Sequence, residues 1–176
     1  MGKTCTLSSE IVHKNKWYRI RHDEIIRPDG TVGPYYVLER ESFCLVMSEH
    51  DGRFLLVEED RYPTGTRVLD FPGGGFEPNE DPRTAALREF EEETGYRATA
   101  IRLLSAPYAY VGISNVRSYI YLTSGPYEHV GQNLDSSEEG LKVLWLTREE
   151  IRARLKGRPE ASGDVLKCLA AYDMFR

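Results

Sequence analysis

The sequence lacks several features that define large classes of proteins. No apolar run approaches the ~20 residues that a transmembrane helix requires, and the first ten residues, MGKTCTLSSE, lack the apolar stretch of a secretory signal peptide. The cysteines, Cys5, Cys44 and Cys168, are widely spaced and form no CxxC or Cys/His metal motif. We therefore expect free thiols, a cytoplasmic location and no membrane partner.

Positive charge is also scarce. The chain has 23 Lys and Arg against 28 Asp and Glu, a net charge of −5, so bulk electrostatics would not hold a nucleic acid. A phosphate-bearing ligand would need a local basic pocket or bound cations. No internal repeat or low-complexity segment interrupts the 176 residues, a length that suits one compact domain with a small addition.

Strands dominate the expected secondary structure. They are rich in β-branched and aromatic residues, and turn signals such as the Pro-Asp-Gly at 28–30 separate them. We expect strands at residues 17–26, 34–40, 43–47, 54–59, 68–71, 98–104, 117–123 and 141–146. With the helices below, this order predicts an α/β (α+β) fold. Residues 1–40 would form an N-terminal β extension and 41–176 the main domain.

Three helices are expected from their end signals. Asp81 is a favourable N-cap, Pro82 suits the first helical position, and Gly95 suits the position just past the end. The sequence TREE at 147–150 is a capping box that begins a second helix. A third helix should run from about 164 to 174.

The first of these helices places glutamates on one face. Glu89 is three residues from Glu92 and four from Glu93, so the three side chains are neighbours. Like charges at this spacing destabilise a helix by about 0.2–0.5 kcal/mol per pair, unless water or cations offset them. Mg²⁺ and Mn²⁺ prefer carboxylate and phosphate oxygens as ligands. On these residues alone, a metal site and a solvated acidic surface are both open interpretations.

The flanking residues favour the metal site. The series runs Gly74, five residues, Glu80, seven residues, Arg88-Glu89-Phe90, one residue, Glu92-Glu93, one residue, Gly95-Tyr96. It resembles the Nudix box, with every charged and glycine position matched. Phe90 and Tyr96 depart from the family in being aromatic rather than aliphatic. Both are packing positions, so we expect little functional cost.

Membership of the Nudix hydrolase family implies a mixed β-sheet between helices. It also implies that Glu89, Glu92 and Glu93 bind Mg²⁺ or Mn²⁺, with the Gly73 carbonyl as a further ligand. Arg88 and Glu80 would hold the loop and the helix together, while Gly74 and Gly95 would be structural. We count Glu92, Glu93 and Arg88 among the catalytic residues as well.

The resemblance extends to one subfamily. The segment RYPTGTRVLDFPGG at 61–74 and the block at 17–30 look like the ADP-ribose and ADP-sugar pyrophosphatases. The resemblance implies a homodimer in which both chains line the substrate site. Val111 stands where ADP-ribose pyrophosphatases usually have proline, and Gly73 replaces a common alanine. These departures weaken the case for ADP-ribose itself.

Three residues outside the box are candidates for substrate binding. Arg61 could clamp a phosphate with its guanidinium, or be a surface arginine. Arg117 could bind phosphate or serve in packing. Trp17 could stack on a base bound to the partner chain, or pack in the core or an interface.

The general base is expected in the loop before the strand at 141–146. In the resembling pyrophosphatases a loop glutamate takes the proton of the attacking water. The register of LKVLWLTREE points to Glu139, with Glu138 as the alternative. We therefore expect hydrolysis of a nucleoside diphosphate linked to a sugar or similar group. Hydrolysis of nucleoside triphosphates or another nucleotide, or a non-catalytic nucleotide-sugar sensor, are the alternatives.

Overall fold

The computed structural model describes residues 2–136, 138–157 and 163–176, and these form two units. The first unit contains the residues up to Ser42 together with Pro107–Ser118, and the second contains Phe43–Ala106 and Tyr119–Arg176. The chain therefore leaves the second unit once, at residue 107, to complete the first.

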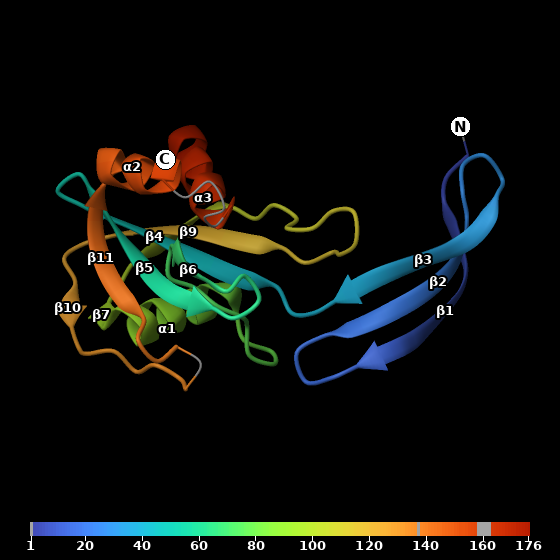
Figure 1. Cartoon of the computed structure of the whole chain (residues 1–176), viewed down its shortest axis with the longest axis horizontal. Coiled ribbons are helices and arrows are strands. Elements are labelled where there is room, and N and C mark those ends of the chain that lie inside the picture. The colour runs from blue at the N-terminus through green and yellow to red at the C-terminus, as the bar shows by residue number, and fades with distance from the viewer. Residues whose placement is uncertain (1, 137, 158–162) are drawn as a thin grey trace. The chain divides into compact units, whose positions relative to one another are not determined.

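The first unit is built on a three-stranded antiparallel sheet in the order β1-β2-β3. Its strands are β1 (Cys5–Lys14), β2 (Arg19–Ile26) and β3 (Val32–Glu39) (Figure 1). The predicted turn at 28–30 joins β2 and β3, and Gly30 adopts a φ of 87° that favours glycine. The returning segment is tied to β3, because Leu38 donates its N–H to the Ile113 carbonyl at 2.8 Å.

Strand β1 was not expected from the sequence. All ten of its residues are exposed, so it has no buried face to impose alternation of apolar and polar residues. Within the part of the chain that the structure describes, it pairs on one side only, with β2. The predicted strand at 17–26 also begins later, at Arg19, because the Asn15 side chain accepts the N–H groups of Trp17 and Tyr18 at 2.8 and 2.9 Å. Those three residues form a turn instead.

The second unit contains a six-stranded sheet in the order β11-β5-β4-β9-β8, with β6 beside β5. Its strands are β4 (Phe43–His50), β5 (Arg53–Arg61), β6 (Thr66–Asp70), β8 (Ile101–Ser105), β9 (Ser118–Ser124) and β11 (Lys142–Thr147). Two short strands, β7 (Tyr96–Arg97) and β10 (Glu128–His129), pair with each other. The sequence did not indicate these two-residue strands.

Among the described residues, three helices accompany this sheet: α1 (Pro82–Thr94), α2 (Arg148–Gly157) and α3 (Gly163–Phe175). Their predicted end signals are confirmed. The Asp81 carboxylate accepts the N–H groups of Arg83 and Thr84, and Gly95 ends α1 with a φ of 74°. Glu150 and Thr147 exchange the two hydrogen bonds of the capping box. No helix in the described part of the chain is long and apolar enough to cross a membrane.

Separate hydrophobic clusters cover the two faces of this sheet. On β5, the even-numbered Phe54 and Leu56 pack with residues of α2 and α3, whereas Leu55 packs with residues of α1. This alternation follows from the two-residue period of a strand. The predicted arrangement, a mixed sheet between helices with a small antiparallel sheet at the N-terminus, is confirmed (Figure 1).

Candidate metal and active site

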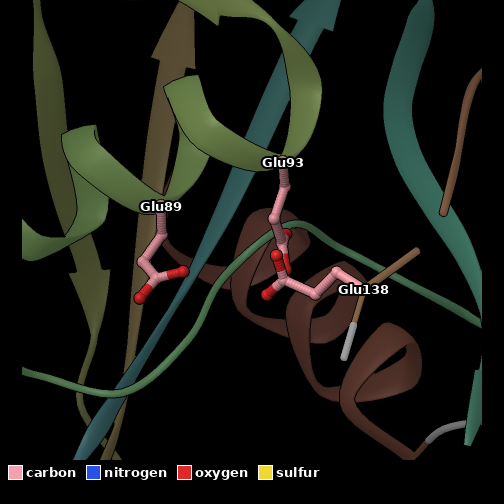
Figure 2. A group of neighbouring side chains, drawn as sticks. All are labelled: Glu89, Glu93 and Glu138. Atoms are coloured by element: carbon pink, nitrogen blue, oxygen red, sulfur yellow. The ribbon is translucent and has the colours of Figure 1, made fainter. Parts of the chain in front are cut away.

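Three carboxylates from two parts of the chain converge beside α1. Glu89 and Glu93 lie on the helix and Glu138 on the loop before β11, and each offers one oxygen within 4.8 Å of the other two. Figure 2 shows the Glu93 and Glu138 carboxylates facing each other, with Glu89 one turn along the helix. Clustered carboxylate oxygens are the ligands that Mg²⁺ and Mn²⁺ prefer. The residues therefore fit a divalent cation.

Burial makes the two helix carboxylates, Glu89 and Glu93, unfavourable in their charged form. Glu93 is only 3% exposed, and this burial raises the pKa of its carboxyl well above the usual range, with a smaller contribution from the negative charge of Glu89. Burial likewise raises the pKa of Glu89, although the neighbouring Arg88 acts in the opposite direction. A bound cation would remove the repulsion between these groups.

Two glycines allow the loop before α1 to approach both the helix and β4. A Cβ atom on Gly74 would lie 2.5 Å from the Glu89 carboxylate, and one on Gly73 would lie 2.1 Å from the Cys44 carbonyl oxygen. The contact at 73 is with backbone and is too short for any side chain, whereas a side chain at 74 would displace the Glu89 carboxylate. The glycine at 73, which departs from the family's common alanine, is therefore explained by the close packing of this loop on β4.

The backbone of Gly73 faces the carboxylates. Its N–H donates to Glu93 Oε2 at 2.8 Å. The carbonyls on either side, those of Pro72 and Gly74, accept the N–H groups of Val46 and Cys44 on β4. Because successive carbonyls of an extended chain alternate in direction, the Gly73 carbonyl is directed away from β4. The Gly73 carbonyl oxygen, the expected metal ligand, thus lies on the same side of the loop as the Gly73 N–H, which donates to Glu93.

Arg88 joins the loop to the helix as expected. Its Nε and Nη2 donate to the two oxygens of Glu80, both at 2.9 Å, and Nη2 also donates to the Gly75 carbonyl. Its Nη1 donates to Glu89 at 2.8 Å and to Glu92 at 3.0 Å. Glu92 is therefore paired with Arg88 and lies outside the group formed by Glu89, Glu93 and Glu138.

A tight turn sets the position of Glu138. The Asp135 N–H donates to Glu138 Oε2 at 3.0 Å, and the Leu141 N–H donates to the Glu138 carbonyl at 2.9 Å. The next residue, Glu139, is exposed and outside the group. The structure thus brings Glu138, rather than Glu139, to the box glutamates. The Asp-x-x-Glu spacing at 135–138, similar to a capping box, was the available signal for this turn.

The same loop is attached to the C-terminal end of α1. Asn133 donates its N–H to the Glu92 carbonyl at 2.9 Å, and Gln132 donates its side-chain amide to the Glu93 carbonyl at 2.6 Å. These bonds satisfy carbonyls that the helix leaves without an internal partner. A Cβ on Gly95 would lie 2.9 Å from the Gln132 nitrogen. Glycine at 95 is thus required both for its positive φ and for this contact.

The remaining candidates have identifiable contacts. On β5, Arg61 forms an ion pair with Glu59, a buried acid that the sequence did not single out. Within the first unit, the Arg117 guanidinium lies 4.5 Å from the centre of the Tyr108 ring and donates to its hydroxyl at 3.1 Å. Trp17, also in the first unit, is 69% exposed, and the Lys16 ammonium lies 4.3 Å from the centre of its ring.

The chain matches two known family models. Residues 38–167 match the model of the NUDIX domain, which is more than half of the chain, so the protein belongs to the Nudix family. Residues 6–38 match the model described as the nucleoside diphosphate sugar hydrolase N-terminal domain. The two matches meet at residue 38, near the end of β3.

Three curated relatives illustrate the range of similar proteins. ADP-sugar pyrophosphatase from Mus musculus is 25% identical over 88% of this chain and 78% of its own length. ADP-ribose pyrophosphatase from Bacillus subtilis is 26% identical over 87% of this chain and 83% of its own. CMP-5'-(N-acetyl-N-hydroxy-3-aminopropyl)phosphonate hydrolase from Streptomyces rubellomurinus is 28% identical over 93% and 80%.

A solved structure supports the fold. The crystal structure of an ADP compounds hydrolase superposes with a TM-score of 0.84 and covers 98% of this chain and 94% of that one, at 17% sequence identity. Two chains can share this architecture at such low identity because packing and hydrogen-bond geometry constrain the fold more than the individual side chains do.

Proposed function

We propose that this protein hydrolyses the diphosphate bond of a nucleoside diphosphate linked to a sugar or similar group. The products would be a nucleoside monophosphate and a phosphorylated sugar. The observation that carries this proposal is the convergence of Glu89, Glu93 and Glu138 to within 4.8 Å in a chain with an intact Nudix box. The names of the three relatives support the substrate class, since each names a nucleotide joined to another group.

We infer that Mg²⁺ or Mn²⁺ is the cofactor. Glu89, Glu93 and Glu138 would hold it together with the Gly73 carbonyl, and Glu92 would join them where a further cation binds. Such a cation would neutralise the diphosphate oxygens and lower the pKa of the attacking water. Arg88 supports this arrangement by holding Glu89 and Glu92 to the loop that carries Gly75.

We further propose that adjacent loop glutamates divide two roles. Glu138 lies within reach of the box glutamates, which supports a role as a ligand, and a coordinated carboxylate is a poor proton acceptor. Glu139 is exposed and next in sequence, so a small movement of the loop on substrate binding could bring it to the water. Glu139 is therefore our candidate for the general base, and Glu138 acting as the base is the alternative.

A substrate screen tests the proposed function. ADP-ribose, ADP-sugars, other nucleotide sugars and nucleoside triphosphates would be incubated with the protein and Mg²⁺, and the products separated. We expect turnover of at least one nucleotide sugar to a nucleoside monophosphate, abolished by a chelator. Turnover of triphosphates alone would favour the second enzymatic alternative. Binding of a nucleotide sugar without turnover would favour a sensor.

We also propose a homodimer in the cytoplasm. Residues 1–40 would mediate dimerisation, since they expose several large apolar side chains, among them Tyr36 on β3 and Trp17 in the turn between β1 and β2. A partner chain could in this way bring Trp17 to the substrate base, while Arg117 would contact phosphate. The cytoplasmic location is supported by the free thiols of Cys5, Cys44 and Cys168.

A further inference from the structure

A buried acid outside the Nudix box lies on β5. Glu59 is 5% exposed, a rare environment for a carboxylate without a specific partner. The two-residue period of a strand puts residues 55, 57, 59 and 61 on one face of β5. Leu55 packs on this face with Ala85 and Phe90 of α1. Glu59 and Arg61 therefore lie on the face of the sheet that carries α1 and its glutamates.

Arg61 is the cation that compensates Glu59. Its Nη2 lies 2.5 Å from Glu59 Oε1, and the Glu59 side chain is 7% exposed whereas that of Arg61 is 50% exposed. Burial raises the pKa of the Glu59 carboxyl, Arg61 acts in the opposite direction, and the negative charges of Glu138 and Asp135 add to the rise. A guanidinium has five N–H donors in a fixed plane. Because Arg61 uses one of these donors to bind Glu59, other N–H groups at the exposed edge of its guanidinium can bind a second anion.

The backbone of Arg61 is fixed as well. Its carbonyl accepts the N–H groups of Thr64 and Gly65 at 3.1 and 2.9 Å, and the Thr64 hydroxyl at 3.1 Å. These bonds close the turn that follows β5. The side chain is thus held at its base by the turn and at its tip by Glu59.

We propose that Glu59 is a positioning residue, which holds the Arg61 guanidinium on the α1 face of β5 so that its remaining N–H groups bind the substrate diphosphate. This inference rests on the proposed function, because it requires a diphosphate beside the acid cluster. It gives Glu59 no part in holding a cation, since Glu59 lies outside the group of Glu89, Glu93 and Glu138.

Steady-state kinetics with ADP-ribose and Mg²⁺ would test this role, or with the nucleotide sugar that the substrate screen selects. In Glu59→Ala the KM should rise by about tenfold while kcat changes by less than about threefold, because a preorganised charged hydrogen bond to the ground-state phosphates is lost. Glu59→Gln should recover most of the loss, because its amide oxygen still accepts from Arg61. The double variant Glu59→Ala, Arg61→Ala should be no worse than Arg61→Ala, because both changes remove one interaction.

Asp60→Ala is the matched control. It removes the same charge from the same strand, but this side chain is 79% exposed and pairs with Arg67 on the other face. We expect its KM to match that of the wild type. Mn²⁺ affinity should be unchanged in Glu59→Ala. A structural collapse, or a role of Glu59 as a metal ligand, would instead lower that affinity.

Binding of α,β-methylene ADP separates this inference from the proposed function. This non-hydrolysable diphosphate should bind Glu59→Ala about tenfold more weakly than wild type in calorimetry with Mg²⁺. If the wild type turns over no nucleotide sugar, the proposed function fails, and this titration still tests the positioning role. Equal affinity in the two proteins, or additive losses in the double variant, would overturn the role of Glu59 alone.

Discussion

Glu93 shows why the acid cluster favours a cation. Its carboxylate is almost fully buried and its hydrogen-bond donor is the backbone N–H of Gly73, which carries no net charge. Glu89 and Glu138 add negative charge within 4.8 Å. Neutralising this group by a divalent ion satisfies all three side chains at once. A bound cation would thus relieve the charge repulsion among the two helix glutamates and Glu138.

The first prediction concerns these ligands. Glu93→Gln and Glu89→Gln should each lower Mg²⁺-dependent turnover by roughly a thousandfold, since loss of a ligand weakens the stabilisation of transition-state charge by several kcal/mol. The amide has almost the same shape, so circular dichroism should show an intact fold. Glu91→Gln is the control, because Glu91 lies on the same helix but pairs with Arg97. Normal activity in Glu93→Gln would refute the metal assignment.

The second prediction separates the two loop glutamates. Glu139→Gln should lower kcat by about two to four orders of magnitude, the range for losing a general base, while Mn²⁺ affinity stays unchanged. Glu138→Gln should weaken Mn²⁺ binding as well as turnover. Metal titration and single-turnover kinetics on both variants would measure this. Should Glu139→Gln behave as wild type and Glu138→Gln lose only kcat, Glu138 is the base.

For individual residues, the sequence predicted the types of side chain in the candidate site better than the exact positions that supply them. Spacing placed the box glutamates on one helix face, and the resemblance to the Nudix box implied the roles of Arg88, Glu80 and the glycines. Glu138 and Glu139 are adjacent, so only the turn that Asp135 forms distinguishes their positions. Glu59 had no signal at all, since an acid in a strand is usually exposed, and its burial depends on the elements packed around it.

At the scale of elements, α1 was the best predicted part of the chain. The two aromatic departures from the box, Phe90 on α1 and Tyr96 on β7, have partners that the sequence could not reveal. Phe90 lies 5.8 Å from Tyr127 between ring centres, and Tyr96 lies 6.2 Å from both Tyr127 and Trp145. Aromatic pairs at these separations contribute about 0.5–1.5 kcal/mol beyond their buried area. The two aromatic side chains thus pack in an aromatic cluster with Tyr127 and Trp145.

The sheet of the first unit supplies a prediction on pH. Asp23 is 5% exposed and accepts hydrogen bonds from Arg21 at 2.9 Å and from the Ser9 hydroxyl at 2.6 Å. The Arg21 guanidinium, and then Ser9, hold the pKa of the Asp23 carboxyl below its ordinary value. A lowered pKa in the folded state adds stability that is complete above the ordinary value near ~3.9. That stability is lost as pH falls through the lowered pKa.

Wild type should therefore lose stability below about pH 4 more steeply than Asp23→Asn, and the two should converge once the pH is below the lowered pKa. Trp17 fluorescence during urea unfolding would follow the first unit, in a Trp145→Phe background that removes the other tryptophan. Glu24→Gln, an exposed acid on the same strand, is the control. Parallel pH profiles for wild type and Asp23→Asn would exclude this contribution.

At the scale of the whole molecule, assembly is the main prediction. Trp17 is 69% exposed, Tyr36 56% and Leu7 53%, and a three-stranded sheet that leaves such side chains in water favours association. We expect a homodimer at micromolar concentration in analytical ultracentrifugation, and a monomer for the combined change Trp17→Glu, Tyr36→Glu. Met174→Glu, an exposed apolar residue of the second unit, should leave the dimer intact. A monomeric wild type would contradict the proposal.

The order of elements could be predicted because helix caps, turns and buried apolar runs are local signals. Strand β1 could not, because all its residues are exposed and only pairing with β2 defines it. The return of residues 107–118 to the first unit was equally hidden, since the bond from Leu38 to Ile113 joins positions far apart in sequence. What the sequence missed were contacts that exist only after the chain has folded.

The separation of the two hydrophobic clusters has a practical consequence for engineering. Every carboxylate of the candidate site belongs to the α1 side of the sheet, whereas α2 and α3 pack on the opposite side. Thermostabilising substitutions could be placed on the outer surfaces of α2 and α3, for example at Leu166, which is 60% exposed. The sheet would separate these positions from the candidate site. Stability and catalysis could in this way be optimised independently, without the usual trade-off between them.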